Sequence, residues 1–138
     1  MYLLDTNVIS EARKRARANA GVRDFFKRIA AEQAPIFLSV VTVGELRRGI
    51  DLIRHRGDVP QANRLEKWLA GLLRDYDDFI LDVDADIAQL WGRLRVPHPE
   101  NALDKLIAAT ALIHDLTVVT RNHSDFTRTG ARVLDPFS

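Results

Sequence analysis

The chain has 138 residues, 46% of them hydrophobic, and a formal net charge of +1. The length suits one domain with one core over residues 1–138, and this hydrophobic content excludes a disordered chain. The near-neutral charge excludes a strong global attraction to nucleic acid or membranes, so any affinity for a polyanion has to come from local patches. Cysteine is absent, which excludes a disulfide scaffold and a thiolate zinc site.

No basic segment followed by a long apolar run opens the chain, which argues against a signal peptide. No apolar run approaches the ~20 residues that are needed to span a membrane. We therefore expect a soluble protein of the cytoplasm.

Short apolar runs alternate with helical patterns along the chain. The expected elements, in chain order, are a strand at 2–4, a helix from 6 to about 17, a helix around 22–29, a strand at 36–38, a helix at about 42–56, a turn at 57–60, a helix at about 60–77, a strand at 79–81, a helix around 87–94, a helix at 101–114, and strands at 117–120 and 131–134. This alternation predicts an α/β fold, a three-layer α/β/α sandwich with a central parallel sheet of four to five strands.

Four acidic residues lie where the predicted strands give way to helices: Asp5, Glu45, Asp104 and Asp125. In an open parallel sheet, ligands bind outside the carboxyl ends of the strands, so we expect these acids to converge there. Carboxylates gathered in this way repel one another and stay ionised at neutral pH only when cations lie among them. The pattern therefore predicts a divalent-metal site.

Each acid taken alone also has a structural explanation near a helix N-terminus. These alternatives are Thr6 as a cap beside Asp5, a capping box formed by Thr42 and Glu45, Asn101 as a cap before Asp104, and Asp125 as a cap. The occurrence of all four acids at the same predicted end of the sheet favours the metal site.

Neutral polar side chains add oxygen donors beside the acids: Asn7, Thr42, Thr120 and Asn122. Ligation by oxygen alone favours Mg²⁺ or Mn²⁺, and the four histidines show no metal-ligand spacing. Two such ions can clamp the attacking and departing oxygens of a phosphodiester and lower the pKa of a bound water. The number of ions and the identity of the general base stay open.

Four segments resemble, in order, the motifs of the PIN-domain nucleases, and specifically the VapC-type toxins of bacterial toxin–antitoxin pairs. The four segments are residues 2–11 (YLLDTNVISE), 38–49 (LSVVTVGELRRG), 104–111 (DKLIAATA) and 117–126 (TVVTRNHSDF). The resemblance implies an endoribonuclease that depends on Mg²⁺ or Mn²⁺ and inhibits translation and growth by cutting tRNA, rRNA or mRNA. It implies catalytic and metal-binding roles for the four acids, with supporting polar roles for Thr6, Thr120 and Asn122.

The resemblance also implies a homodimer, or a hetero-oligomer with a small antitoxin that carries a DNA-binding domain. Trp68, Leu72 and Tyr76, on the amphipathic helix at 60–77, are candidates either for antitoxin contact or for the core. Phosphate contacts give affinity without sequence preference, and Arg121, next to the acids in sequence, is predicted to steer the RNA backbone. Single-stranded loops are the easier RNA target.

Three other classes are less consistent with the sequence. A response-regulator receiver needs an early acidic pair and a late lysine, but Thr6 follows Asp5 and no lysine follows the strand at 117–120. A haloacid-dehalogenase-type phosphatase needs a second acid two residues after its nucleophilic aspartate, where this chain has Asn7. An inert PIN-like binding module is disfavoured because all four acids are present.

Overall fold

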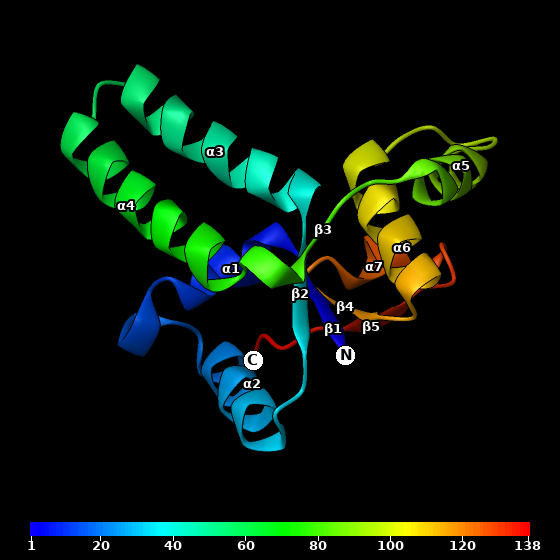
Figure 1. The fold of residues 1–138 in the computed structure, drawn as a ribbon, viewed down its shortest axis with the longest axis horizontal. Helices are drawn as coiled ribbons and strands as arrows, with labels where there is room; N and C mark the ends of the chain where they lie inside the picture. Colours follow the sequence, from blue (N-terminus) through cyan, green and yellow to red (C-terminus); the bar gives the residue numbers. More distant parts are fainter.

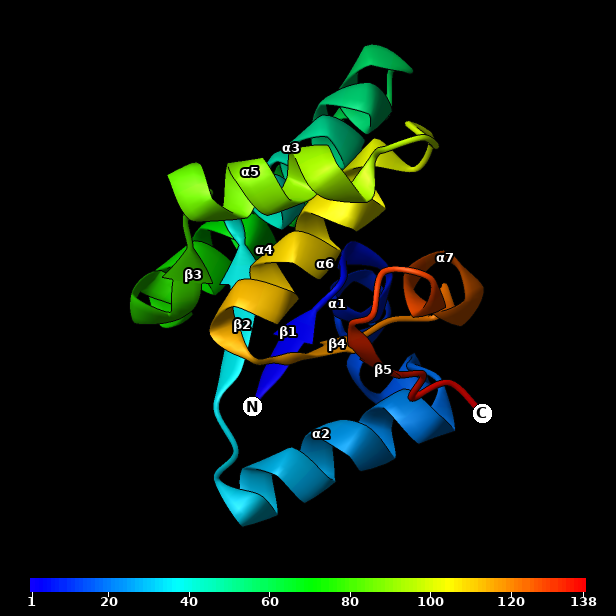
Figure 2. The ribbon, with the colours of Figure 1, turned by 90° about the vertical axis from the view of Figure 1, so that its right-hand side faces the viewer.

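The computed structural model describes all residues, 1–138, and contains a five-stranded sheet with helices on both faces (Figures 1 and 2). The strands are β1 (Tyr2–Leu4), β2 (Ile36–Ser39), β3 (Ile80–Leu81), β4 (Thr117–Val119) and β5 (Arg132–Leu134). Their order is β3-β2-β1-β4-β5, and every neighbouring pair is parallel. In the register of the central strand, Tyr2 of β1 lies opposite Ile36 of β2 and Thr117 of β4. The predicted parallel α/β/α sandwich is confirmed.

Seven α-helices cover the sheet. They are α1 (Thr6–Ala12), α2 (Ala20–Glu32), α3 (Val40–His55), α4 (Val59–Asp75), α5 (Ala85–Leu94), α6 (Ala102–His114) and α7 (His123–Thr127). The α3–α4 hairpin extends well beyond the sheet (Figure 1). None of the helices combines the length and the apolar character that crossing a bilayer requires.

Consecutive residues of a strand pack into two separate hydrophobic cores, because side chains alternate between the two faces of the sheet. Leu4 and Val119 belong to the larger core, in which residues of α1, α2, α3 and α4 pack. Leu3 and Val118 belong to the smaller core, which α6 and Phe126 of α7 complete. Both faces of the sheet are therefore covered, and ligands reach it only at its edges.

The first helix is shorter than expected, because it ends at Ala12 and not near residue 17. Three consecutive cations, 13–15, follow it, Arg15 adopts a left-handed backbone with φ of 55°, and a 3₁₀ helix occupies Arg15–Arg17. The three side chains at 13–15 are charged and cannot form an apolar helix face that packs against the core. Such packing supplies most of the stability of a helix in a protein. The chain therefore turns here towards α2.

Three other boundaries differ from the sequence prediction. Ser39 caps α3, so this helix begins at Val40, two residues before its expected start. Asp58 caps α4, and Pro60 lies inside its first turn, where proline is favoured, so the turn between the two helices is shorter than 57–60. Phe79 belongs to a 3₁₀ helix (Asp77–Phe79) and not to β3.

Two glycines give a matched test of the packing. Gly49 lies inside α3, and an added Cβ would meet nothing within 4 Å. We expect Gly49→Ala to raise the free energy of unfolding by about 0.5–1 kcal/mol, because alanine is the better helix former. At Gly21 an added Cβ would lie 2.2 Å from the carbonyl oxygen of Pro136, so Gly21→Ala should instead lower it by about 1–3 kcal/mol. Urea unfolding measures the change in the free energy of unfolding for both variants. A Gly21→Ala protein as stable as the original would contradict the packing of the C-terminal tail against Gly21.

Candidate functional site

A pocket of about 310 Å³ lies at the carboxyl edge of the sheet and gathers three of the four predicted acids. Asp5 follows β1 directly, Glu45 projects from α3 after β2, and Asp104 stands in the first turn of α6. The complete wall consists of Asp5, Thr6, Asn7, Val41, Thr42, Glu45, Leu103, Asp104, Ile107 and Asn122. Residues that are up to 117 positions apart in sequence meet here because parallel strands end at one edge.

Asp5 is the best-fixed member of the pocket, with only 7% of its surface exposed. Its Oδ1 accepts a hydrogen bond from the backbone N–H of Thr6 at 2.8 Å. Its Oδ2 accepts from the Thr120 hydroxyl at 2.8 Å and from the Asn7 side-chain amide at 3.4 Å. Burial raises the pKa of the Asp5 carboxyl, and the hydrogen bonds from Thr120 and Thr6 oppose this rise. Asp5 itself caps α1, so the prediction that Thr6 is the cap was wrong.

The supporting polar residues join the ends of β1 and β4. The Thr120 hydroxyl oxygen accepts from the Asn7 side chain at 3.2 Å and from the backbone N–H of Asn122 at 3.0 Å. The side-chain oxygen Oδ1 of Asn7 accepts a hydrogen bond from the backbone N–H of Arg121 at 3.1 Å. Thr120 is fully buried and does not line the pocket, whereas Asn7 and Asn122 do. Thr120 therefore acts by holding the Asp5 carboxylate in place.

Glu45 takes no part in a capping box. Because the side chain of Ser39 caps α3, accepting from the N–H of Val41 at 3.1 Å, Thr42 and Glu45 lie within the helix and share one face. This face forms one wall of the pocket. The Thr42 hydroxyl is the one buried side-chain polar atom in the protein that has no hydrogen-bond partner. A buried orphan oxygen in a pocket wall calls for a ligand or a water.

Asp104 is half-buried, and its pKa is raised to about 6. Burial is the largest cause, followed by the negative charges of Asp5 and Asp125. Asn101, before the helix, has a left-handed backbone with φ of 56°, and its side chain makes no capping hydrogen bond. The capping role considered for Asn101 is therefore wrong. The charges of Asp5 and Asp125 therefore act on Asp104, as is expected when carboxylates converge at one edge of the sheet.

Asp125 lies beside this pocket and not within it. It stands in the first turn of α7, is exposed, and lines an adjacent cavity together with Lys105 and Arg128. It does not occupy the cap position of α7, which belongs to Asn122, so the capping alternative for Asp125 is wrong. Its charge nevertheless acts on Asp104 across the boundary between the two cavities.

The side chain of Arg121 lies outside the acidic pocket. The guanidinium carbon lies 4.0 Å from the ring centroid of Phe137, near the C-terminus. The pKa of the Glu11 carboxyl is lowered mainly by hydrogen bonds from Lys14 and Asn19, and the charge of Arg121 adds a smaller contribution. The side chain of Arg121 is not part of the pocket wall. Only the backbone N–H of Arg121 contributes to the acidic site, through Asn7.

The residues present fit a divalent cation with oxygen ligands. The pocket wall supplies carboxylate, amide and hydroxyl oxygens but no histidine, a set that suits Mg²⁺ or Mn²⁺. The unpaired Thr42 hydroxyl and the raised pKa of Asp104 both mark a site that a cation would stabilise. In this arrangement no three acids stand close enough to hold one ion jointly.

The sequence did not reveal the apolar part of the wall. Val41, Leu103 and Ile107 line the pocket beside the acids, and Leu103 is 47% exposed. Helical periodicity alone would assign these apolar side chains to the core. Asp84 also follows a strand, β3, but its carboxylate caps α5 by accepting from the N–H of Ile87 at 2.9 Å.

Comparison with known proteins identifies the class. The PIN domain family model matches residues 2–131. The plasmid stability protein StbB of Pseudomonas syringae pv. tomato is 36% identical over 99% of this chain and 99% of its own length. The toxin FitB of Neisseria gonorrhoeae is 34% identical over 99% of both chains. The VapC ribonuclease Y4jK of Sinorhizobium fredii is 34% identical over 99% of this chain and 98% of its own. The chain therefore belongs to the PIN-domain family.

Solved structures agree with this assignment over the whole chain. The crystal structure of FitAcB from Neisseria gonorrhoeae matches with a TM-score of 0.84 and 34% identity, covering 99% of this chain and 98% of that one. The structure of FitAB bound to an IR36 DNA fragment matches with a TM-score of 0.85 and 32% identity, covering 100% and 96%. The expected PIN-like fold is thus confirmed.

Proposed function

We propose that this protein is the toxin of a type II toxin–antitoxin pair and a Mg²⁺- or Mn²⁺-dependent endoribonuclease. The observation that carries the proposal is the convergence of Asp5, Glu45 and Asp104 in one oxygen-lined pocket of a PIN-domain fold. A relative that is named a VapC ribonuclease and another that is named a toxin support it. The substrate would be tRNA, rRNA or mRNA in the cytoplasm, and its cleavage would inhibit translation and growth.

Each acid has a distinct part in this proposal. Asp5, rigidly held, would be the fixed anchor of the cation site, with Glu45 and Asp104 completing it from α3 and α6. A bound divalent cation would supply charge neutralisation at the phosphate and a more acidic water. Asp125, at the rim, would act on that water or on the cation from outside the pocket. Thr6, Asn7 and Asn122 would add neutral oxygens and amide donors.

An antitoxin would occupy the apolar groove between α1 and α4. This groove, of about 180 Å³, has walls that include Trp68, Leu72 and Tyr76, with Arg13 and Arg15 at its margin. The three large side chains also pack against the main core, so antitoxin contact would be an additional role for them. The structure of FitAB bound to DNA supports a partner that itself carries a DNA-binding domain. Homodimerisation, alone or within such a hetero-oligomer, is part of the same proposal.

Incubation of the purified protein with total bacterial RNA tests the nuclease. We expect discrete fragments in Mg²⁺ or Mn²⁺ and none in EDTA, because the acids need a cation to act on a phosphodiester. Mapping the fragment ends would identify the RNA class and the cleaved sequence. The absence of metal-dependent cleavage across tRNA, rRNA and mRNA would reject the proposal in favour of a binding module.

Arg121 gives a further test, because its proposed contact with the RNA backbone requires the guanidinium to leave the ring of Phe137. In Arg121→Ala the backbone N–H that supports Asn7 is retained, so only the side chain is tested. We expect KM to rise by roughly 2- to 3-fold, with kcat unchanged, and the salt dependence of binding to weaken. Steady-state cleavage at several salt concentrations measures both, and unchanged values would remove Arg121 from the RNA path.

A further inference from the structure

A second polar cavity, of about 440 Å³, adjoins the acidic pocket, and Asp125 is the one residue of its wall that has a part in the proposed chemistry. It lies between the loop that joins α5 to α6 and the short helix α7. Asp104 and Lys105 are consecutive residues that line the acidic pocket and this cavity respectively. After β4, Asn122 of the loop lines the acidic pocket, and Asp125 of α7 lines the second cavity. The two cavities therefore share a boundary.

The cations of this cavity have no acidic partner of their own. Of the five charged or titratable residues in its wall, His98 and Glu100 are neighbours, with 3.6 Å between Nδ1 and Oε1. Asp125 belongs to the proposed cation site. Lys105 contacts only the backbone carbonyl oxygen of His98, and Arg128 forms neither an ion pair nor a side-chain hydrogen bond.

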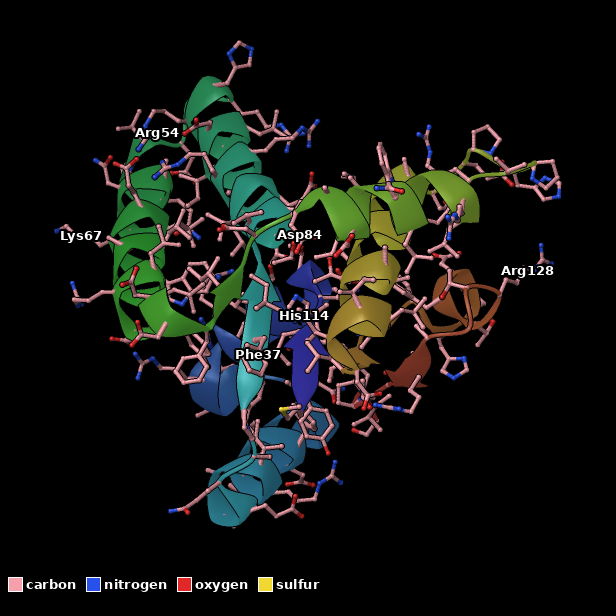
Figure 3. All side chains as sticks on the ribbon, turned by 45° about the vertical axis from the view of Figure 1, so that its right-hand side comes forward. Phe37, Arg54, Lys67, Asp84, His114 and Arg128 are labelled. Carbon is pink, nitrogen blue, oxygen red and sulfur yellow. The ribbon has the colours of Figure 1, made fainter.

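The position of Arg128 favours an anionic ligand in this cavity. Arg128 lies at the C-terminal end of α7, and Figure 3 shows it at the outer margin of the molecule, on the side of the α5–α6 loop. With Lys105 on α6, two cations from different elements line the cavity. Guanidinium and ammonium groups that are left free beside a phosphodiester site suit the next phosphate of the substrate.

The remaining wall suits a base. Asn101, Ser124 and Thr129 supply hydrogen-bonding groups, and Leu94 and Val96 supply apolar surface. Val96 is 77% exposed, so its side chain is accessible to a ligand. Unpaired RNA bases are recognised by stacking on side chains and by hydrogen bonds to their edges. A purely electrostatic docking site for an acidic peptide would not need this combination.

We propose that this cavity is a nucleotide subsite, which binds the single-stranded nucleotide next to the scissile phosphodiester, with Lys105 and Arg128 on its phosphate. The inference rests on the proposed nuclease function and extends it: selectivity for the flanking base would come from the α5–α6 loop and α7. Lys105 and Arg128 touch the substrate away from the reacting atoms, so they set KM more than kcat.

Arg128→Ala is the first test, because this exposed side chain supports nothing else in the fold. Binding of a short, labelled, single-stranded oligoribonucleotide is measured by fluorescence anisotropy in Mg²⁺, in an Asp5→Asn background that prevents cleavage. We expect affinity to fall roughly 3- to 10-fold, and the slope of log affinity against log salt to fall by about 0.7. Lys105→Ala should act in the same direction, and Arg128→Lys should restore part of the affinity. In the active protein Arg128→Ala should raise KM and leave kcat nearly constant.

Arg132→Ala is the matched control, since it removes the same charge from the first residue of β5, at the amino end of the strands, and Arg132 does not line the cavity. Equal RNA binding in Arg128→Ala and Arg132→Ala would overturn the subsite. Loss of binding to a polyglutamate peptide but not to RNA in Arg128→Ala would also overturn it and assign the cavity to a protein partner. Failure of the unmodified protein to cleave any RNA would reject the nuclease function alone, because the binding measurement does not depend on cleavage.

Discussion

Asp5→Asn is expected to reduce metal-dependent RNA cleavage by at least about 10²- to 10³-fold, which corresponds to several kcal/mol of lost transition-state stabilisation. Asp5 is the buried anchor of the acidic pocket, and its charge is the property that asparagine lacks. The shape and most of the hydrogen bonding should survive, because the asparagine oxygen can still accept from the N–H of Thr6. The fold should therefore persist, with a free energy of unfolding within about 1 kcal/mol of the original.

Cleavage rates at saturating Mg²⁺, together with a thermal melt of each protein, test this expectation. Asp24→Asn is the control, because Asp24 is an exposed acid on α2, outside the acidic pocket. Equal residual activity in Asp5→Asn and the unmodified protein would show that a contaminant cuts the RNA, and the acidic pocket would lose its assigned role.

The convergence of the acids was predictable because it depends on topology alone. Once strands and helices alternate, the carboxyl ends of parallel strands meet at one edge, and residues such as Asp5 and Asp104 are placed there. Helix boundaries were less predictable, as the early end of α1 at Ala12 shows. That end depends on whether the following side chains find apolar neighbours, which is a property of the tertiary structure.

The division of the site into two cavities was also beyond the sequence. Asp125 follows its strand much as Asp5 does, yet the turn after β4 directs it to the cavity of Lys105 and Arg128. Likewise, Arg121 is close to the acids in sequence, but its side chain follows Phe137 of the C-terminal tail. Side-chain direction in a loop depends on such distant contacts, whereas residue order does not reveal them.

Asp104 is expected to make the stability of the protein depend on pH in a way that a divalent cation reverses. Its pKa is raised from 3.8 to about 6 in the folded protein, so the neutral carboxyl is favoured by folding. In EDTA the resulting stability should be complete below the unfolded value of 3.8 and lost as the pH rises through about 6. We expect a loss of about 1 kcal/mol, because the half-exposed position of Asp104 screens much of the shift.

Cation binding requires the ionised carboxylates, so Mg²⁺ should stabilise the protein above about pH 7 and have little effect near pH 5. Thermal unfolding at both pH values, in EDTA and in Mg²⁺, measures the two trends. In Asp104→Asn the destabilisation with rising pH in EDTA should shrink, and the Mg²⁺ effect should largely vanish, whereas Asp24→Asn should retain both. If Asp104→Asn kept the full response to Mg²⁺, Asp104 would not be a ligand, and the cation site would have to be built from Asp5 and Glu45 without α6. The raised pKa would then reflect only the burial of an acid beside Asp5 and Asp125.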